Sequence, residues 1–266
     1  MKIKELVNAL DYEIAPKQYQ ESYDNCGLIV GDSESEITGV LTTLDIDEFV
    51  IQEAIEKNCN LIIAHHPTIF KGLKTLAGNN LNEKIVISAI KNDIAIYAAH
   101  TSLDNRFCGS INEYIAKKIG LTEIKPLIKP KDLNYLNGGS GAIGIIEGSD
   151  FIIDFLCKTK QNLNLRGSIK HSSVIVNKPI KTVAICTGAG FFMTNEAKRQ
   201  GADLFITSDL TYHNFFDERD IVLADIGHYE SEIHASVVIY NLIKERFPEL
   251  NIMISKINTN PVSHAI

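Results

Sequence analysis

Short apolar runs alternate with helical patterns along the chain, and this alternation constrains the fold more than any other feature of the sequence. In the first half, three strand-like runs are each followed by a helical pattern: 37–46 and 47–58, 61–64 and 82–92, 94–99 and 109–120. Strands joined by helices of this length form βαβ crossovers, which place consecutive strands parallel in one sheet. We therefore predict an α/β fold with mixed, largely parallel sheets.

The alternation is interrupted once. The stretch 125–144 is rich in Pro, Gly and Lys, which is typical of a connection between two halves. A short strand, a helical run over 149–163 and a strand over 171–176 follow it before the alternation resumes at 182–190. These features predict an N-terminal α/β lobe, a connecting segment with extra strands and a helix, and a C-terminal α/β lobe within one compact fold: 1–124, 125–180 and 181–266.

The C-terminal lobe repeats part of the N-terminal lobe. The segment 53–63 matches the segment 196–206 at a constant offset. Further along each lobe, a strand is followed by histidine and, four residues later, by a carboxylate: His100 and Asp104, His228 and Glu232. The offsets of the two matches differ slightly, which indicates a tandem of diverged α/β lobes rather than a short-period solenoid.

Charge, hydropathy and cysteine spacing exclude several classes of protein. The net charge of −7 and the isoelectric point near 5.6 argue against a sequence-independent nucleic-acid binder, which needs a basic face. No stretch approaches the roughly 18 apolar residues of a membrane helix. Residues 1–18 read as an amphipathic helix with acidic residues too early for a signal peptide. Five scattered cysteines without a CxxC pair indicate free, mostly buried thiols, so we expect a cytoplasmic protein.

Two adjacent histidines, His65 and His66, follow the apolar strand 61–64 and precede a proline. Neighbouring side chains of an extended backbone point to opposite sides, so these imidazoles would not easily chelate one ion. Each could instead bind one ion of a pair about 3.5–4 Å apart. The alternative is a pair of loop histidines that hydrogen-bond to the backbone.

Two further strand-to-helix junctions carry side chains that bind metals. Asp104 follows the strand 94–99, with His100 one loop turn away, although an Asp-Asn pair before a helix is also typical of an N-cap. His228 and Glu232 stand four residues apart on one face at the start of an amphipathic helix. This spacing suits a metal ion, but it is also common on solvated helix faces.

Three such junctions in one chain favour a metal site. Imidazole together with carboxylate suits Zn, Fe, Mn or Ni rather than Ca or Mg. Two ions with few ligands need a shared group, and Glu232 could bridge them through its two oxygens. The side chains at these junctions that could bind two divalent ions per chain are His65, His66, His100, Asp104, His228 and Glu232.

Five sequence blocks, taken in order, resemble the signature blocks of the Nif-three-like family, whose members are commonly labelled GTP cyclohydrolase I type 2 homologues. The blocks are DNCGLIVG (24–31), LIIAHHPTIF (61–70), AAHTSLDN (98–105), GADLFITSDL with a following histidine (201–213) and GHYESE (227–232). The resemblance runs on to the final NPVSHAI and implies two α/β lobes with a dinuclear site in the cleft between them. It also implies a homohexamer, a trimer of dimers. The segment between the lobes is too short for the central domain that some members carry, so the chain resembles the short form.

The resemblance also implies roles for individual residues. One ion is held by His65 and His228, the other by His66 and Asp104, and both by Glu232.

Two further histidines are candidates for catalysis. The resemblance makes His100 a residue that orients a ligand or transfers a proton, although the repeat alone would make it a ligand. His213 is a candidate for substrate contact or general-acid catalysis, and the alternative is a surface histidine.

Other residues near the expected site have plainer alternatives. The glycine-containing loop in 182–191 could bind a phosphate through its backbone N–H groups, or its glycines could serve a tight turn. Asp24 and Asn25 are expected in a turn. Cys26 and Cys186 are expected to be small buried thiols of the core.

The combined prediction is a dinuclear-metal-dependent hydrolase, in which metal-activated water attacks an electrophilic carbon or phosphorus atom. The family label implies GTP or a related nucleotide as substrate, with hydrolytic opening of the imidazole ring of guanine. Two alternatives stay open. One is a non-enzymatic metal-binding oligomer that acts as scaffold, metal chaperone or regulatory protein. The other is a pterin- or nucleotide-binding protein with structural metals.

Overall fold

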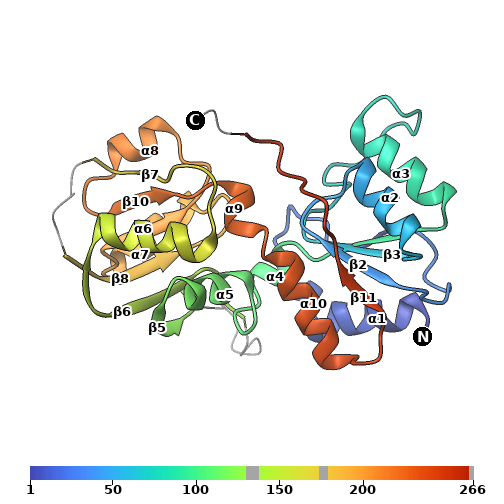
Figure 1. The fold of residues 1–266 in the computed structure, drawn as a ribbon, viewed down its shortest axis with the longest axis horizontal. Coiled ribbons are helices and arrows are strands. Elements are labelled where there is room, and N and C mark those ends of the chain that lie inside the picture. The colour runs from blue at the N-terminus through green and yellow to red at the C-terminus, as the bar shows by residue number, and fades with distance from the viewer. Residues whose placement is uncertain (130–137, 174–178, 264–266) are drawn as a thin grey trace. The chain divides into compact units, whose positions relative to one another are not determined.

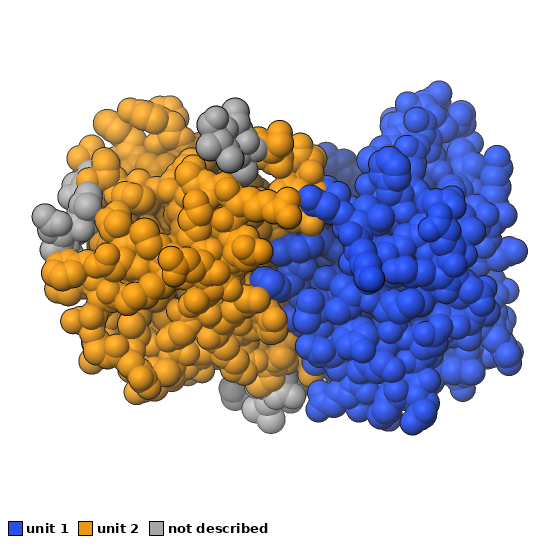
Figure 2. All heavy atoms as spheres, viewed as in Figure 1, with its two compact units in different colours: residues 1–103, 233–259 blue, residues 104–232, 260–266 orange. Residues whose placement is uncertain are grey.

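The computed structural model describes residues 1–129, 138–173 and 179–263, which form two compact units with one mixed sheet each (Figures 1 and 2). Unit 1 comprises residues 1–103 and 233–259, and unit 2 comprises residues 104–232 with those that follow 259. These boundaries differ from the predicted lobes for two reasons. The last helix and strand belong to the first unit, and the predicted connecting segment supplies strands to the second sheet.

Unit 1 contains a five-stranded sheet in the order β1-β4-β3-β2-β11. Its strands are β1 (Gly27–Val30), β2 (Val40–Thr43), β3 (Leu61–Ala64), β4 (Ala95–Ala98) and β11 (Ile252–Ile254). Four of them run parallel, and β1 pairs antiparallel with β4. The strands predicted in 37–46, 61–64 and 94–99 are confirmed.

Two helices of unit 1, α2 and α3, begin where the sequence supplies a cap. Asp47 and Asn80 accept hydrogen bonds from the backbone N–H groups of Val50 and Glu83, and they start α2 and α3. The apolar faces of both helices enter one buried cluster with the central strands. The helical elements are α1 (Ile3–Ala9), the π-helical η1 (Leu10–Ile14), the 3₁₀ turn η2 (Lys17–Tyr19), α2 (Glu48–Glu56), α3 (Leu81–Lys91) and α10 (Ala235–Arg246).

Unit 2 contains a six-stranded sheet in the order β5-β6-β8-β9-β10-β7. Its strands are β5 (Leu121–Lys125), β6 (Ala142–Phe151), β7 (Lys170–His171), β8 (Pro179–Ile185), β9 (Leu204–Thr207) and β10 (Val222–Asp225). Among the described residues, β8, β9 and β10 are parallel, whereas β5, β6 and β7 each pair antiparallel with a neighbour. The prediction of largely parallel sheets is therefore wrong for this unit. Of the strand predicted over 171–176, residues 174–176 lie outside the described residues.

Six helical elements lie wholly within the described part of unit 2. They are α5 (Ile111–Lys118), α6 (Ile152–Leu163), the 3₁₀ turn η3 (Phe191–Met193), α7 (Thr194–Arg199), α8 (Tyr212–Asp217) and α9 (His228–Glu232). The single helix predicted to begin at His228 is instead divided into α9 and α10. A further short helix, α4 (Thr101–Asp104), follows β4 at the boundary between the units. No helix in the described part of the chain combines the length and apolar content needed to cross a membrane.

The predicted repeat is confirmed as a shared framework of strands. The register of β2, β3 and β4 matches that of β8, β9 and β10: Leu61 lies opposite Val40 and Ala95, and Leu204 lies opposite Val183 and Val222. In each unit an antiparallel strand flanks this set, β1 beside β4 and β7 beside β10. The carboxyl ends of the three parallel strands therefore form equivalent edges in the two units, and ligands bind at such edges in open α/β sheets.

Candidate metal site

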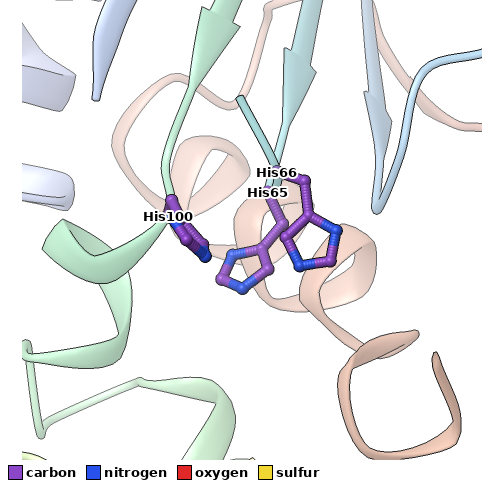
Figure 3. A group of neighbouring side chains, drawn as sticks. All are labelled: His65, His66 and His100. Carbon is purple, nitrogen blue, oxygen red and sulfur yellow. The ribbon is translucent and has the colours of Figure 1, made fainter. Parts of the chain in front are cut away.

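Three histidines gather at the carboxyl ends of β3 and β4 in unit 1 (Figure 3). The ring centroids of His65 and His66 lie 5.0 Å apart, and the ring of His100 lies 5.2 and 5.3 Å from them. Each residue offers one nitrogen to a set whose members all lie within 4.8 Å of one another. In the sequence, the three histidines follow two separate strands, and these two strands are neighbours in the sheet.

The expectation that His65 and His66 point to opposite sides is wrong. Strand β3 ends at Ala64, and the backbone bends at both histidines, so that the alternation of an extended strand no longer applies. Their backbone N–H groups still donate to Thr43 O (3.1 Å) and Leu44 O (3.0 Å) of the neighbouring chain segment. This bend brings both rings to one side.

Each of these imidazoles directs Nδ1 at an oxygen that accepts its proton. The contacts are His65 Nδ1 to Ala99 O (2.9 Å), His66 Nδ1 to Asp45 Oδ1 (2.7 Å) and His100 Nδ1 to Asp24 Oδ1 (2.9 Å). Because a carbonyl or carboxylate oxygen only accepts, Nδ1 carries the hydrogen, and in the neutral ring Nε2 carries the lone pair. Histidines that bind metals in proteins are commonly held in this way by an outer carboxylate or carbonyl.

The side chain of Asp24 is 0% exposed. It also accepts from the backbone N–H of Thr101 (3.0 Å), from Thr101 Oγ1 and from Cys26 Sγ (3.1 Å). Burial alone raises the pKa of the Asp24 carboxyl, but hydrogen bonds from His100 and Thr101 outweigh burial and hold the pKa well below its usual range. The expectation of a turn residue therefore missed the contact of Asp24 with His100.

In unit 2 the corresponding strand ends carry His228 and Glu232 on α9. His228 Nε2 lies 2.9 Å from Glu232 Oε2, and His228 Nδ1 lies 2.7 Å from Asp209 Oδ2. The hydrogen bond to Glu232 raises the pKa of His228 to about 9 against the opposing effect of burial, and the charge of Glu232 and the contact with Asp209 raise it further. Without a metal ion, a proton therefore stays between His228 and two carboxylates at neutral pH.

Glu232 is buried against the glycine-containing loop that follows β8. Gly188 has a positive φ of 67°, and a Cβ at this position would collide with Glu232 Oε1. The backbone N–H groups of the loop are directed at side chains of the protein: Thr187 N at Asn112 Oδ1, Gly188 N at Ser231 Oγ and Gly190 N at Thr207 Oγ1, each at 2.9 Å. These contacts favour the steric role of the glycines over phosphate binding.

Asp104 ends α4 and does not cap the next helix. Ser110 has that role, because its Oγ accepts from Glu113 N at the start of α5. Burial raises the pKa of the Cys186 thiol, and the negative charges of Asp104 and Glu232 raise it further. The negative charges of both carboxylates therefore reach the same thiol of unit 2. Cys26 and Cys186 are buried and free, as expected, and burial raises the pKa of Cys26 to about 11.

The five expected ligands are thus divided between the units. His65 and His66 belong to unit 1, and Asp104, His228 and Glu232 belong to unit 2. His213 lies on α8 of unit 2, where it is exposed and its ring packs edge-on against Tyr212 at 5.4 Å. The ring of His100 lies only 0.2 to 0.3 Å farther from the rings of His65 and His66 (5.2 and 5.3 Å) than those two rings lie from each other (5.0 Å).

The donors in each unit suit a divalent ion of the Zn, Fe, Mn or Ni class. Imidazole Nε2 atoms with a fixed tautomer are good ligands for such ions, and a buried carboxylate adds a hard anionic donor. In unit 2, an ion would take the place of the proton shared by His228 and Glu232. The residues present therefore fit a metal ion.

Sequence reasoning missed the acceptors that orient the imidazoles. Asp45 follows β2, and Asp209 follows β9 with a positive φ of 59°. The signal that could have identified both aspartates in the sequence was their position two residues after buried strands of the repeat. Ala99 acts through its backbone oxygen, which leaves no trace in a side-chain pattern.

Comparison with known proteins agrees with the sequence blocks. The model of the family Duf34/NIF3 (NGG1p interacting factor 3) matches residues 1–261. A "GTP cyclohydrolase 1 type 2 homolog" of Clostridium perfringens is 34% identical over 264 residues, which cover 98% of each chain. A protein with the same name from Campylobacter jejuni is 35% identical and covers 96% of this chain and 98% of the relative. The crystal structure of a hypothetical protein of Staphylococcus aureus has a TM-score of 0.91 at 31% identity, covering 100% of this chain and 99% of the other. The chain therefore belongs to the Duf34/NIF3 family.

Proposed function

We propose that the protein is a dinuclear-metal-dependent hydrolase that holds two divalent ions through five side chains: His65, His66, Asp104, His228 and Glu232. The observation that supports this proposal most directly is the orientation of the imidazoles. Their Nδ1 atoms lie against oxygen acceptors, which leaves Nε2 as the atom that would bind a metal ion. The names of the curated relatives support GTP or a related nucleotide as the substrate.

When bound, two divalent ions lower the pKa of water and stabilise negative charge that develops on an electrophilic centre. The protein's own contribution is to fix the donors. Asp45 and Asp209 hold the Nδ1 protons of His66 and His228. Glu232, enclosed beside Gly188, keeps its carboxylate in place, and this carboxylate and His228 Nε2, which lie 2.9 Å apart, would hold an ion in place of the proton they share.

Proton transfer by His213 is part of this proposal. His213→Gln should lower the rate of nucleotide hydrolysis by about 10²- to 10⁴-fold, because general acid-base catalysis contributes that much. The metal content should stay unchanged. Loss of metal in this variant would contradict a role limited to proton transfer.

Assembly as a homohexamer, a trimer of dimers, is the other part of the proposal that comes from the family resemblance. Light scattering of the purified protein measures it directly, and a monomer at micromolar concentration would contradict it.

The first test is the metal content of protein purified without a tag or chelator, measured beside the Glu232→Ala variant. We expect about two equivalents per chain in the parent and at most one in the variant, since Glu232 is the shared ligand. Glu230→Ala is the matched control, because it removes another carboxylate from the same helix. The Glu230 carboxylate accepts a hydrogen bond from Asn260 Nδ2 (3.0 Å), and its loss should leave two equivalents of metal per chain.

Turnover is tested on the same samples with GTP and other nucleotides. Hydrolysis that needs metal and disappears in Glu232→Ala supports the enzyme. Two equivalents of metal without turnover of any nucleotide would favour the scaffold, chaperone or regulatory alternative. One equivalent or none in the parent would overturn the dinuclear site.

A further inference from the structure

We propose that Tyr23 and Phe70 form a stacking site for the planar base of a nucleotide, next to the histidines of unit 1. This inference rests on the proposed function in taking a nucleotide as the ligand. It adds the side chains that would recognise the base, and neither of them is among the candidate metal ligands. Both residues belong to unit 1.

The first support is the exposure of two neighbouring aromatic rings. Tyr23 is 64% exposed and Phe70 is 43% exposed, although the centroids of their rings lie only 6.4 Å apart. The ring of Phe70 also lies edge-on to that of His100, at 6.2 Å. Aromatic side chains gain much from burial, and exposed apolar surface beside polar groups often marks a ligand site. The two rings therefore offer apolar surface to a ligand that approaches the histidines.

The second support is the way the backbone holds both rings. Asn25 Nδ2 donates to Ile69 O (2.6 Å). This hydrogen bond joins the segment that carries Tyr23 to the segment that carries Phe70. Asp24, the residue between Tyr23 and Asn25, is fixed by its buried carboxylate. A surface that is held in advance loses little freedom when a ligand binds, which favours affinity.

The third support is the angle between the rings. The planes of Tyr23 and Phe70 are inclined at 57° to each other. Aromatic rings interact favourably in an offset stack or edge to face. A base that stacks on one of these rings meets the other at a steep angle, close to the edge-to-face arrangement. One planar ligand can therefore contact both rings.

The rings define the class of ligand by shape. Stacking recognises the flat face of a heteroaromatic base and reads little of its edge. A purine has a larger face than a pyrimidine, so we expect purine nucleotides to bind more tightly. A ligand without a base gains nothing from this site.

The first test uses the absence of tryptophan from the sequence. Phe70→Trp introduces a single tryptophan, whose fluorescence is quenched when a base stacks on the indole ring. We expect GTP, added by rapid mixing to the metal-loaded variant so that binding is read before turnover, to quench this fluorescence saturably. Inorganic triphosphate, which has no base, should not quench it.

Phe151→Trp is the matched control. Phe151 is 53% exposed, but it pairs with Pro179 at the start of β8, at the opposite end from the carboxyl ends of the parallel strands. GTP should not quench this variant saturably. Equal quenching of the two variants would show collision with the nucleotide only and would overturn the inference, as would the absence of saturable quenching in a folded Phe70→Trp variant.

The second test measures the affinity for GTP by calorimetry and covers the case in which Phe70→Trp does not fold, which circular dichroism detects. Tyr23→Ala and Phe70→Ala should each weaken binding by about 5- to 150-fold, the usual effect of losing a ring that stacks on a base. Tyr23→Phe and Phe70→Tyr keep a ring and should bind GTP as the parent does. The metal content of all four variants should equal that of the parent, and a loss of metal would mean that the rings act through the metal site.

The outcomes separate this inference from the proposed function. Metal-dependent hydrolysis of GTP, with unchanged affinity in both alanine variants, would overturn the stacking site and leave the hydrolase standing. Saturable quenching of Phe70→Trp in a protein that hydrolyses no nucleotide would leave the stacking site standing while the hydrolase fails.

Discussion

The two units use one framework of strands for two different sets of donors. In each unit three parallel strands in the same register end at one edge of the sheet, and an antiparallel strand flanks them. Unit 1 places three imidazoles at this edge, whereas unit 2 places one imidazole and two carboxylates in its own donor set. The comparison teaches that the strand ends supply positions, while single residues at those positions decide the chemistry.

One pair of matching positions makes this difference concrete. By register, Asp45 after β2 corresponds to Gly188 after β8. Asp45 accepts the Nδ1 proton of His66, whereas Gly188 lacks a side chain and leaves its space to Glu232. The same position therefore orients a ligand in unit 1 and makes room for one in unit 2.

The largest expected effect comes from closing that space. Gly188→Ala adds a Cβ at a positive φ and against Glu232, and we expect a loss of about 3 kcal/mol in the free energy of unfolding. Gly201→Ala is the matched control, because Gly201 has a similar φ of 76° with nothing within 4 Å of an added Cβ. It should cost only about 1 kcal/mol. Urea unfolding measures both, and equal costs would show that Gly188 makes no room for Glu232.

The next effect compares the acceptors of the two units. Asp24→Ala removes a fully buried carboxylate and leaves the donors of His100 and Thr101 without an acceptor, so we expect a loss of about 2 kcal/mol. Asp209→Ala removes a carboxylate whose side chain is 52% exposed, and water can replace it. The expected loss there is below about 1 kcal/mol. A larger loss from Asp209 than from Asp24, in urea unfolding of metal-free protein, would reverse the comparison.

The smallest effect concerns the proton on His228 in metal-free protein. The folded pKa of about 9 lies above the unfolded value of about 6.5, so the charged form stabilises the folded state. This contribution is fully present below about pH 6.5 and is lost as the pH rises through 9. Because the side chain is 40% exposed, solvent screening limits the effect to about 1 kcal/mol. The difference in unfolding free energy between the parent and His228→Ala should therefore shrink from pH 6.5 to 9.5, and a difference that grows would contradict the assignment.

Local patterns predicted much of this framework. The parallel strands and their helices follow from apolar runs and from capping residues such as Asp47 and Asn80, which act within a few residues of the chain. The flanking strands depend on distant pairing. Strand β11 joins β2 from the far end of the chain, and β6 pairs with both β5 and β8. No short window of sequence contains that information.

The site divides in the same way. The histidines and carboxylates after strand ends were visible as residue types in a pattern, and so the candidate ligands could be named. Their orientation could not be predicted, because it depends on contacts such as that of His100 with Asp24, 76 positions away in the sequence. The bend at His65 and His66 is likewise a tertiary effect, since their N–H groups bond to the segment after β2.

The interrupted path of unit 1 has a consequence for how the protein is made. The chain leaves this unit after Leu103 and returns at Ile233, so that every strand of unit 2 is synthesised before β11. Until residues 235–254 emerge from the ribosome, β2 lacks both the strand that pairs with its outer edge and the helix α10 that packs near it. An unpaired strand edge is a template for association with other chains. The sheet of unit 1 is thus the first to begin forming and the last to be completed. The nascent chain is therefore most prone to aggregation through unit 1, which carries the three histidines.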